Sequence, residues 1–462
     1  MAMKPLFGRY QRVHLVGIGG ARMEGLARIL RQMGCQVSGS DRAESAAVDG
    51  LRRDGFAVQV GHRREQAEGA DLVVFSAAVP ADNAELIEAL HSGIDLVGGA
   101  ELLGELTRGY LTVAVAGSHG KTTTASMVAD ILRQADLEPS VLIGGWRQGR
   151  AQAELKSSRF FVVEADEFQR SFLQLSPSLA LVTNVDAEHL DCYGDLAGVE
   201  DAFCQYLSRM PFYGRCVLAG DGAVGSRVRE SVTFPCSTYG LKAENDFRAD
   251  GIESHSWGSS FEMEKGKERL GRIVLNVPGE HNLRNSLGAA ALANVMGVDF
   301  EAIARGLAGF TGVARRYERR GEEGGVLVID DYAHHPAELA VAIDTAKRSG
   351  RRVVAVFQPH LFSRTRDLCR DFARELCAAD QVFLADVYPS REEPLPGVDG
   401  GMIAREMRER GYRDVVFVPQ KEQLPDRVMQ SCRSGDLVLT LGAGDIDGVS
   451  RALVDGLKQR SS

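Results

Sequence analysis

The feature that most constrains this chain is a pattern that recurs along it: a short apolar run, then glycine or polar residues, then residues with helical periodicity. Such alternation is typical of α/β units built on a parallel sheet. The pattern forms three groups, of which the first two open at about Val13 and Leu111 and the third opens after Arg316. A chain of 462 residues is also too long for one compact core. We therefore expect an α/β protein of three domains, each built on a mostly parallel sheet.

The limits of these domains follow from the same pattern. In the first group, strand-like runs end at Asp41 and at Ser76. The second group includes a more polar stretch from about Cys236 to Val277, which could form antiparallel strands. Functional residues of open sheets gather at the carboxyl ends of the strands. The expected domains are 1–107, 108–313 and 314–462.

Composition and charge exclude several classes of protein. A net charge of -9 argues against a general nucleic-acid binder, which needs a basic surface to displace phosphate counterions. The eight cysteines never form a C-x-x-C pair, so neither a zinc ribbon nor a disulfide framework is indicated, and reduced thiols are expected. The N-terminal residues contain no apolar run long enough for a signal peptide or a membrane span. We expect a cytoplasmic protein without nucleic-acid or membrane partners.

The strongest single motif is Ala116-Gly-Ser-His-Gly-Lys-Thr-Thr, which lies between an apolar run and a helical run. A glycine-rich turn there aims backbone N–H groups at phosphate, Lys121 supplies a positive charge, and Thr122 offers a hydroxyl to Mg²⁺. Val115 stands where the common P-loop has its first glycine, and short G-K-T sequences also occur in simple turns. The flanking strand and helix favour a phosphate loop. The expected ATP contacts are Gly117, Ser118, His119, Gly120, Lys121, Thr122 and Thr123.

Acidic and imidazole side chains follow the next two apolar runs. One run ends in Glu164, Asp166 and Glu167, and the other ends near His189. Acids at a strand end bind a metal or orient water, although an ordinary solvated strand end has the same composition. A histidine there is either a ligand of a divalent cation or a structural group. Together with the lysine and threonine of the phosphate loop, these groups would hold MgATP and stabilise a moving phosphoryl group.

The first domain opens with a modified dinucleotide-binding motif. Gly17, Gly19 and Gly20 match its start, but Arg22 stands where the third glycine belongs. That glycine permits close packing of helix on strand, so NAD binding is disfavoured and a shorter diphosphate ligand is preferred. Asp41 ends the following run and is either a ribose ligand or a solvated acid.

Two strand ends of the third domain carry cationic and aromatic side chains. Asp331 and His335 follow one run, and His360 and Arg364 follow the next. Arginine can donate two parallel hydrogen bonds to a carboxylate or a phosphate. Any one of these residues could be a surface group, but their joint position at sheet ends predicts an anion site.

With these motifs in place, the chain resembles the Mur ligase family over nearly its whole length. The matching segments, in order, are GIGGARM, GSHGKTTT, EADEFQRSFL, TNVDAEHLDCYGDL, PGEHNLRN, GVARRYE, DDYAHHPAE, VFQPHLFSRTRDL, DVYPSREEPLPGV and LGAGDI. The resemblance implies an N-terminal Rossmann-like domain for a uridine nucleotide, a central P-loop ATPase, and a C-terminal Rossmann-like domain that closes over the site.

Within the family, the chain is most similar to members that join L-alanine to UDP-N-acetylmuramate. The implied reaction uses ATP and Mg²⁺: the lactyl carboxylate attacks the γ-phosphorus of ATP, and the amine of L-alanine then displaces phosphate from the acyl phosphate. These small molecules would be its partners, and the chain would be a monomer or a homodimer.

The resemblance also implies roles for single residues. Lys121 would contact the ATP phosphates, while Thr122, Glu164 and His189 would hold Mg²⁺. The catalytic residues implied are Lys121, Glu164, His189, His335 and Arg364. The further nucleotide contacts implied are Asn282, Arg316 and Asp331. The substrate contacts implied are Gly17, Gly19, Gly20, Asp41, Ser76 and His360.

Departures from the family pattern leave alternatives open. Arg22 and Glu24 stand where the family keeps small residues beside the diphosphate, and Arg22 could itself pair with the diphosphate. The chain could also be a sister ligase that attaches a ready-made peptide to recycled muramyl nucleotide. A third alternative is a nucleotide-binding protein that has lost ligase activity. An NAD-dependent oxidoreductase would leave Lys121 unexplained.

Overall fold

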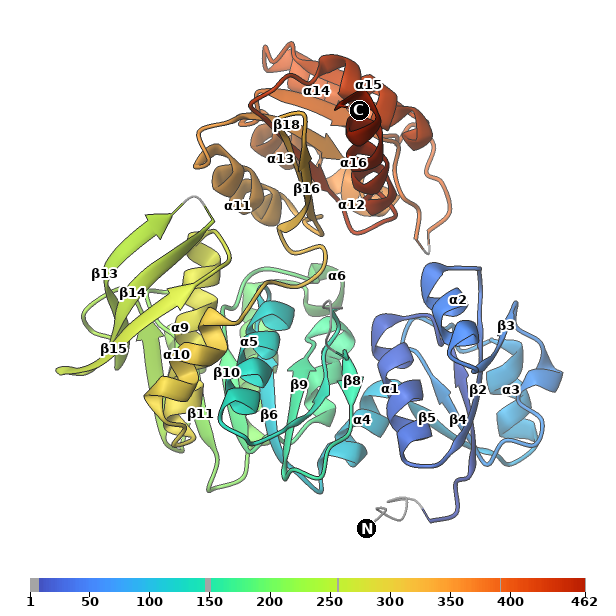
Figure 1. The fold of residues 1–462 in the computed structure, drawn as a ribbon. Helices are drawn as coiled ribbons and strands as arrows, with labels where there is room; N and C mark the ends of the chain where they lie inside the picture. The colour runs from blue at the N-terminus through green and yellow to red at the C-terminus, as the bar shows by residue number, and fades with distance from the viewer. Residues whose placement is uncertain (1–7, 146–150, 256, 391, 462) are drawn as a thin grey trace. The chain divides into compact units, whose positions relative to one another are not determined.

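The computed structural model describes residues 8–145, 151–255, 257–390 and 392–461, and these residues form two compact units (Figure 1). The first unit runs to Glu253 and also includes 259–276 and 282–310, whereas the second includes 254–258, 277–281 and 311–462. The first unit contains two of the three sheets and the second contains the third. The chain is therefore an α/β protein with three sheet-based domains, as predicted.

The N-terminal sheet is wholly parallel, with the order β3-β2-β1-β4-β5. Its strands are β1 (Arg12–Val16), β2 (Gln36–Asp41), β3 (Ala57–Val60), β4 (Leu72–Phe75) and β5 (Asp95–Gly98). Its helices are α1 (Ala21–Gln32), α2 (Ala46–Arg53), α3 (Ala84–His91) and α4 (Gly99–Thr107). The strand order reverses between β1 and β4, and ligands of open parallel sheets bind at such a switch point. The glycine-rich loop that follows β1 is therefore correctly placed for a ligand.

The central sheet has ten strands in the order β15-β14-β13-β12-β11-β10-β6-β9-β7-β8. They are β6 (Leu111–Ala116), β7 (Ser140–Leu142), β8 (Ala153–Glu154), β9 (Phe160–Ala165), β10 (Leu179–Val182), β11 (Arg215–Ala219), β12 (Cys236–Gly240), β13 (Phe247–His255), β14 (Gly258–Lys265) and β15 (Glu268–Leu275). The polar stretch after Cys236 was expected to contain antiparallel strands. This holds for β14 and β15, but β12 pairs in parallel with both β11 and β13. The parallel part of the sheet thus extends further than polarity suggested.

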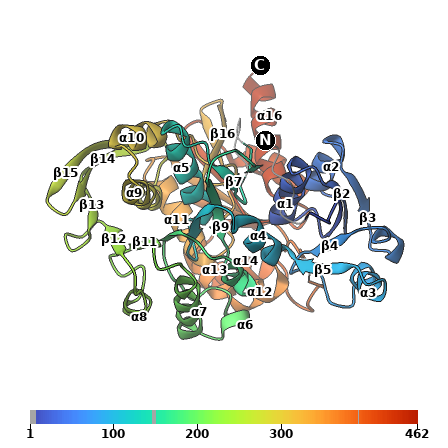
Figure 2. The same cartoon turned by 90° about the horizontal axis from the view of Figure 1, so that it is seen from below.

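Helices cover both faces of this central sheet. They are α5 (Lys121–Gln134), α6 (Leu190–Tyr193), α7 (Leu196–Ser208), α8 (Ser226–Glu230), α9 (Glu280–Val295) and α10 (Phe300–Ala308). Figure 2 shows α5 and α10 on one face, and α7 and α8 on the other. A side chain at Gly306 of α10 would place its Cβ 2.6 Å from the Cα of Ile131, so only glycine permits this close packing on α5. Helix α10 therefore packs directly against the helix that follows the phosphate loop.

The C-terminal sheet has the order β16-β17-β21-β18-β19-β20, and only β16 is antiparallel to its neighbour. Its strands are β16 (Glu318–Glu323), β17 (Val326–Asp331), β18 (Arg352–Phe357), β19 (Gln381–Leu384), β20 (Val415–Phe417) and β21 (Asp436–Leu441). Its helices are α11 (Pro336–Lys347), α12 (Phe362–Asp367), α13 (Cys369–Leu376), α14 (Gly401–Glu409), α15 (Leu424–Ser431) and α16 (Asp447–Ser461). One apolar cluster lies between the sheet and α11, α13 and α14, and a second lies beneath α15 and α16. Two covered faces explain why the inner strands are almost uniformly apolar.

Within the four described ranges, no helix combines the length and the apolar character that crossing a membrane requires.

Candidate active site

The predicted phosphate loop forms a tight turn between β6 and α5. Gly117 and Gly120 have φ values of 133° and 82°, a region that glycine adopts without strain. A Cβ at Gly117 would lie 2.0 Å from Thr183 Oγ1, and one at Gly120 would lie 2.7 Å from Asn285 Oδ1. The backbone N–H of His119 donates to Asn184 Oδ1 at 2.9 Å. The end of β10 and helix α9 therefore leave no room for side chains at these glycines.

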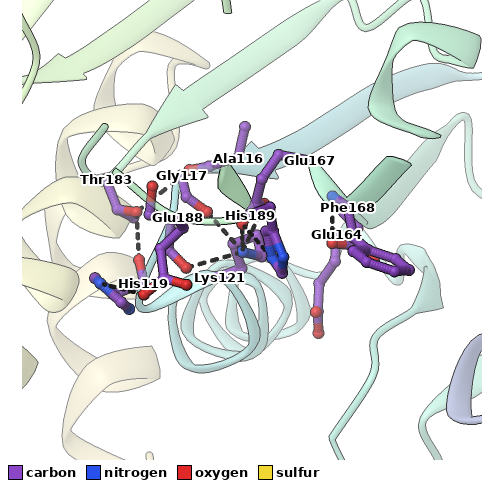
Figure 3. A network of polar contacts seen from close by, with 12 residues as sticks. Ala116, Gly117, His119, Lys121, Glu164, Glu167, Phe168, Thr183, Glu188 and His189 are labelled. Atoms are coloured by element: carbon purple, nitrogen blue, oxygen red, sulfur yellow. Dashed lines mark hydrogen bonds and ion pairs between the residues drawn. The ribbon is translucent and has the colours of Figure 1, made fainter. Parts of the chain in front are cut away.

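Lys121 begins α5 and folds back over the loop (Figure 3). Its Nζ donates to the carbonyl oxygens of Gly117 and Ser118 at 2.7 and 3.0 Å, and to Glu167 Oε2 at 2.8 Å. Burial disfavours the charge on Lys121, but the carboxylates of Glu167, Asp166 and Glu164 outweigh it and raise the pKa of the ammonium. Lys121 is thus held as a cation at the N-terminus of α5, where phosphate is favoured.

The oxygen groups predicted to bind Mg²⁺ meet beside this lysine. Thr122 Oγ1 donates to Glu164 Oε2 at 3.1 Å, and the other carboxylate oxygen accepts from the N–H of Gly144 at 2.6 Å. The contact follows from the sheet, because β6 and β9 are parallel neighbours and place the start of α5 beside the end of β9. A hydroxyl and a carboxylate are hard oxygen donors of the kind that Mg²⁺ takes together with water and phosphate. Thr122 and Glu164 therefore fit this ion.

His189 lies beside the same carboxylate as Lys121. Its Nε2 is 3.6 Å from Glu167 Oε1, and its ring packs against Phe168 with centroids 5.1 Å apart. Figure 3 shows His189 next to Lys121 and Glu167, with Glu164 further along. Among the described residues, no three His, Cys, Asp or Glu side chains are grouped closely enough to hold a metal. A metal-binding role for His189 stays a prediction.

The structure adds Glu167 and Asn184 to the site. Glu167 was recognised in the sequence only as one of three acids, yet its side chain is 2% exposed and pairs with Lys121. The hydroxyl of Tyr193 donates to the backbone carbonyl of Glu167. Asn184 lies two residues beyond the end of β10, and its Oδ1 accepts from the N–H of His119 in the loop. The polar residues after two apolar runs were a signal for both residues, but their partners could not be inferred from it.

The residues predicted to contact the sugar nucleotide also come together. The N–H groups of Gly17 and Ile18 donate to the carbonyl of Ser40, and that of Gly19 donates to Asp41 Oδ2 at 2.8 Å. A Cβ at Gly17 would lie 3.1 Å from the Cβ of Ser76. Asp41 is thus a partner of the loop in this structure, and its contact with a ribose remains a prediction. Gly20 immediately precedes α1, and its carbonyl accepts from the N–H of Glu24 at 2.8 Å.

Arg22, which departs from the family pattern, has partners of its own in the first unit. Its guanidinium donates to Asp166 at 2.7 Å and to Ser171 Oγ at 3.1 Å. The side chains of Arg22 and Asp166 are about one-quarter and one-third exposed. Pairing of Arg22 with a diphosphate would have to compete with these contacts.

The predicted residues of the second unit surround the ends of β17 and β18. Asp331 accepts from the N–H groups of Tyr317 and Ala333 at 2.6 and 2.8 Å, and burial raises its pKa to about 6 although Arg316 opposes the shift. His335 caps α11, and Arg364 lies on α12. Nη1 of Arg364 is buried and has no hydrogen-bond partner among the described residues.

Aromatic packing places the remaining histidine. The ring of His360 lies 5.8 Å from that of His334 and stacks on Tyr388 at 5.7 Å. The two predicted strand ends of this unit therefore meet, as the sequence suggested. Asn282 lies on α9 in the first unit, and its predicted contact with adenine stays untested.

Fold and site together define a class of protein: an α/β nucleotide-binding enzyme in which a phosphate-loop ATPase domain is combined with two Rossmann-like domains. Three family models match the chain, the Mur ligase family catalytic domain over 12–111, the Mur ligase middle domain over 115–293, and the Mur ligase glutamate ligase domain over 315–444. The chain belongs to the Mur ligase family.

Relatives support this assignment along the whole chain. The chain is 42% identical to a UDP-N-acetylmuramate–L-alanine ligase of Salinibacter ruber over 98% of its length and 97% of the relative. It is 41% identical to the enzyme of the same name from Trichlorobacter lovleyi, over 98% of this chain and all of that one. The solved UDP-N-acetylmuramate-alanine ligase of Thermotoga maritima superposes with a TM-score of 0.84 at 28% identity, covering 97% of this chain and 99% of that one.

Proposed function

We propose that this enzyme joins L-alanine to the lactyl carboxylate of UDP-N-acetylmuramate, with ATP hydrolysed to ADP and phosphate, in peptidoglycan precursor synthesis. The observation that carries the proposal is identity of about two residues in five, over nearly all of both chains, to relatives that bear this activity in their names. The phosphate loop and its carboxylates support it, because an acyl phosphate route requires a nucleotide site. Action in the cytoplasm, as a monomer or a homodimer, belongs to the same proposal.

The first step transfers the γ-phosphoryl group of ATP to the lactyl carboxylate. Negative charge gathers on the transferred group, and the ammonium of Lys121 at the N-terminus of α5 is placed to stabilise it. The N–H groups of the loop add fixed dipoles that need no reorganisation. Phosphorylation gives the carboxylate a leaving group that it lacks in water.

Thr122 and Glu164 would hold Mg²⁺, which when bound neutralises phosphate charge. In the structure the hydroxyl already points at the carboxylate, and Gly144 orients the other carboxylate oxygen. Both side chains are thus held in one orientation before the ion binds, which limits the conformational entropy lost when it does.

The second step is attack of the L-alanine amine on the acyl carbon. We propose that the second unit binds the anionic groups of this step. In that unit, Nη1 of Arg364 is buried and has no hydrogen-bond partner among the described residues. A guanidinium suits a carboxylate, and the neighbouring His335 and His360 can orient the amino acid. Asp331 and Arg316 would contact the nucleotide from the same unit.

The decisive experiment measures phosphate release by the purified protein with MgATP, UDP-N-acetylmuramate and L-alanine, omitting each component in turn. Release should require all of them, and the product should be UDP-N-acetylmuramoyl-L-alanine by mass. Replacing L-alanine by other amino acids, or by the tripeptide that a recycling ligase would use, should reduce the rate strongly. A preference for the tripeptide would overturn the proposal in favour of the sister ligase, and ATP binding without substrate-dependent release would favour a silent nucleotide-binding protein.

A further inference from the structure

Two cysteines of the central sheet lie side by side on neighbouring strands. Cys216 is the second residue of β11 and Cys236 is the first residue of β12, and the two are direct register partners in this parallel pair. The N–H of Cys216 donates to the carbonyl of Pro235 at 3.2 Å, so the strands are joined at this point. Register partners in a sheet point to the same face. Both thiols therefore share one face of the sheet.

The surroundings of the two thiols differ in a way that divides their roles. Cys216 is 1% exposed, whereas Cys236 is an exposed residue. Interaction with the neighbouring Cys216 thiol lowers the pKa of Cys236, although partial burial and the charge of Asp246 oppose the shift. Because the thiolate is the reactive form of cysteine, Cys236 is the one placed to react with a dissolved oxidant.

We propose that Cys236 and Cys216 form a reversible disulfide when the protein meets a hydroperoxide, a modification independent of the ligase reaction. The Cys236 sulfur attacks one peroxide oxygen, the O–O bond breaks, and the leaving oxygen departs as water or an alcohol. Cys236 is thereby oxidised to a sulfenic acid. The Cys216 sulfur then attacks the Cys236 sulfur, the S–O bond breaks, and the hydroxyl leaves as water with the proton of Cys216. Two thiols are oxidised and one peroxide is reduced.

The geometry permits this bond and keeps it away from the phosphate loop. Neighbouring strands lie about 4.8 Å apart, within the range of about 4.4–6.8 Å between Cα atoms that disulfides span. Cys236 begins its strand, so it can shift toward its partner without breaking the centre of the sheet. Both residues lie at the amino ends of parallel strands, whereas Lys121 follows the carboxyl end of β6.

The test treats the reduced full-length protein with hydrogen peroxide, then denatures it, alkylates free thiols and maps the peptides by mass. We expect a cross-linked peptide pair that contains Cys216 and Cys236, with two hydrogens lost per chain, restored by dithiothreitol. Free alkylation of both thiols after treatment would overturn the proposal. A disulfide between two chains through Cys236, seen on a non-reducing gel, would overturn it as well.

Variants then separate the two roles. Cys216→Ala should leave Cys236 without a partner, so the same dose should drive it to the sulfinic acid. Cys236→Ser, at an exposed position, should fold normally and leave Cys216 unoxidised. Cys204→Ser is the matched control, and the disulfide should form in it as in the unaltered chain. Oxidation of Cys216 in the Cys236→Ser variant at the wild-type rate would refute the assignment of Cys236 as the reacting thiol.

Discussion

The ammonium nitrogen of Lys121 lies 2.8 Å from Oε2 of Glu167, a carboxylate whose side chain is 2% exposed. An ammonium has three donors, and the carbonyls of Gly117 and Ser118 accept the other two. A phosphate oxygen can therefore be contacted only if one of these bonds is exchanged. The bond to Glu167 is the one that a phosphate replaces with least loss, because phosphate supplies the negative charge that the carboxylate provided.

Glu167→Gln tests this exchange. Removing the carboxylate charge should strengthen ATP binding by about tenfold, which corresponds to about 1.4 kcal/mol, because the phosphates no longer face a buried anion. The rate constant for ligation should fall, since Lys121 loses the group that holds it in place. Binding is measured by calorimetry without the other substrates. Glu230→Gln, an exposed acid of α8, is the control for charge removal, and weaker ATP binding by Glu167→Gln would contradict the exchange.

Lys121→Ala should abolish most activity and also destabilise the fold. Loss of the charge that stabilises the moving phosphoryl group should lower kcat by about 10²–10³-fold. The variant also leaves Glu167 buried without its counter-charge, a loss of about 3–5 kcal/mol in unfolding free energy for such pairs. Denaturant unfolding of Lys121→Ala and of the Lys121→Ala/Glu167→Gln double variant separates the effects. The double variant should be more stable than Lys121→Ala but equally inactive. Equal stability of the single and double variants would show that the Lys121–Glu167 ion pair does not stabilise the fold.

Thr122→Val should raise the Mg²⁺ concentration for half-maximal activity by about tenfold or more. Valine keeps the shape of threonine but removes the hydroxyl that faces Glu164 Oε2. A magnesium titration at saturating ATP measures the shift, and Thr122→Ser, which keeps the hydroxyl, should behave like the unaltered chain. An unchanged magnesium requirement in Thr122→Val would remove this residue from the proposed ligands.

The raised pKa of Asp331 predicts a pH dependence of stability in the second unit. With a pKa of about 6 in the folded protein against 3.8 ordinarily, the folded state binds a proton that the unfolded chain has released. The stabilisation is complete below about pH 4 and is lost as the pH rises through 6. Its size is about 1–3 kcal/mol, nearer the lower value because the side chain is partly exposed.

The Asp331→Asn variant lacks the titrating carboxyl group. Comparing its stability with that of the unaltered chain therefore isolates the pH-dependent contribution of Asp331. The unfolding free energy of the unaltered chain minus that of the variant should decrease between pH 4 and pH 6 and then level off. Chemical denaturation across this range measures the difference. A difference that stays constant with pH would show that burial does not raise the pKa of Asp331.

Arg22→Gly restores the third glycine of the dinucleotide-binding motif. Because Asp166 and Ser171 already hold Arg22, we expect binding of UDP-N-acetylmuramate to change by less than about threefold, with a stability loss of about 0.2–1 kcal/mol. Calorimetry and denaturant unfolding give both values. A loss of affinity of tenfold or more would instead favour direct pairing of Arg22 with the diphosphate, the alternative that the sequence left open.

Much of the fold and of the site could be predicted because the signals are local. Apolar runs such as Leu111–Ala116, followed by glycine and then helical periodicity, predicted parallel sheets and the phosphate loop. The polar stretch after Cys236 misled in part, since polarity reports exposure of a strand and does not report the direction of its neighbour. The direction of β12 relative to β11 and β13 depends on the path of the chain between these strands.

By itself, the sequence determined the three α/β domains, the residue types at the strand ends and the family to which they belong, because these depend on periodicity and on the order of motifs. The tertiary structure alone decided which side chains meet: Lys121 with Glu167, Arg22 with Asp166, and Cys216 with Cys236. The physical reason is that each pair joins residues distant in sequence. Their contact depends on strand order, strand register and helix packing, and these are settled only when the whole core has formed.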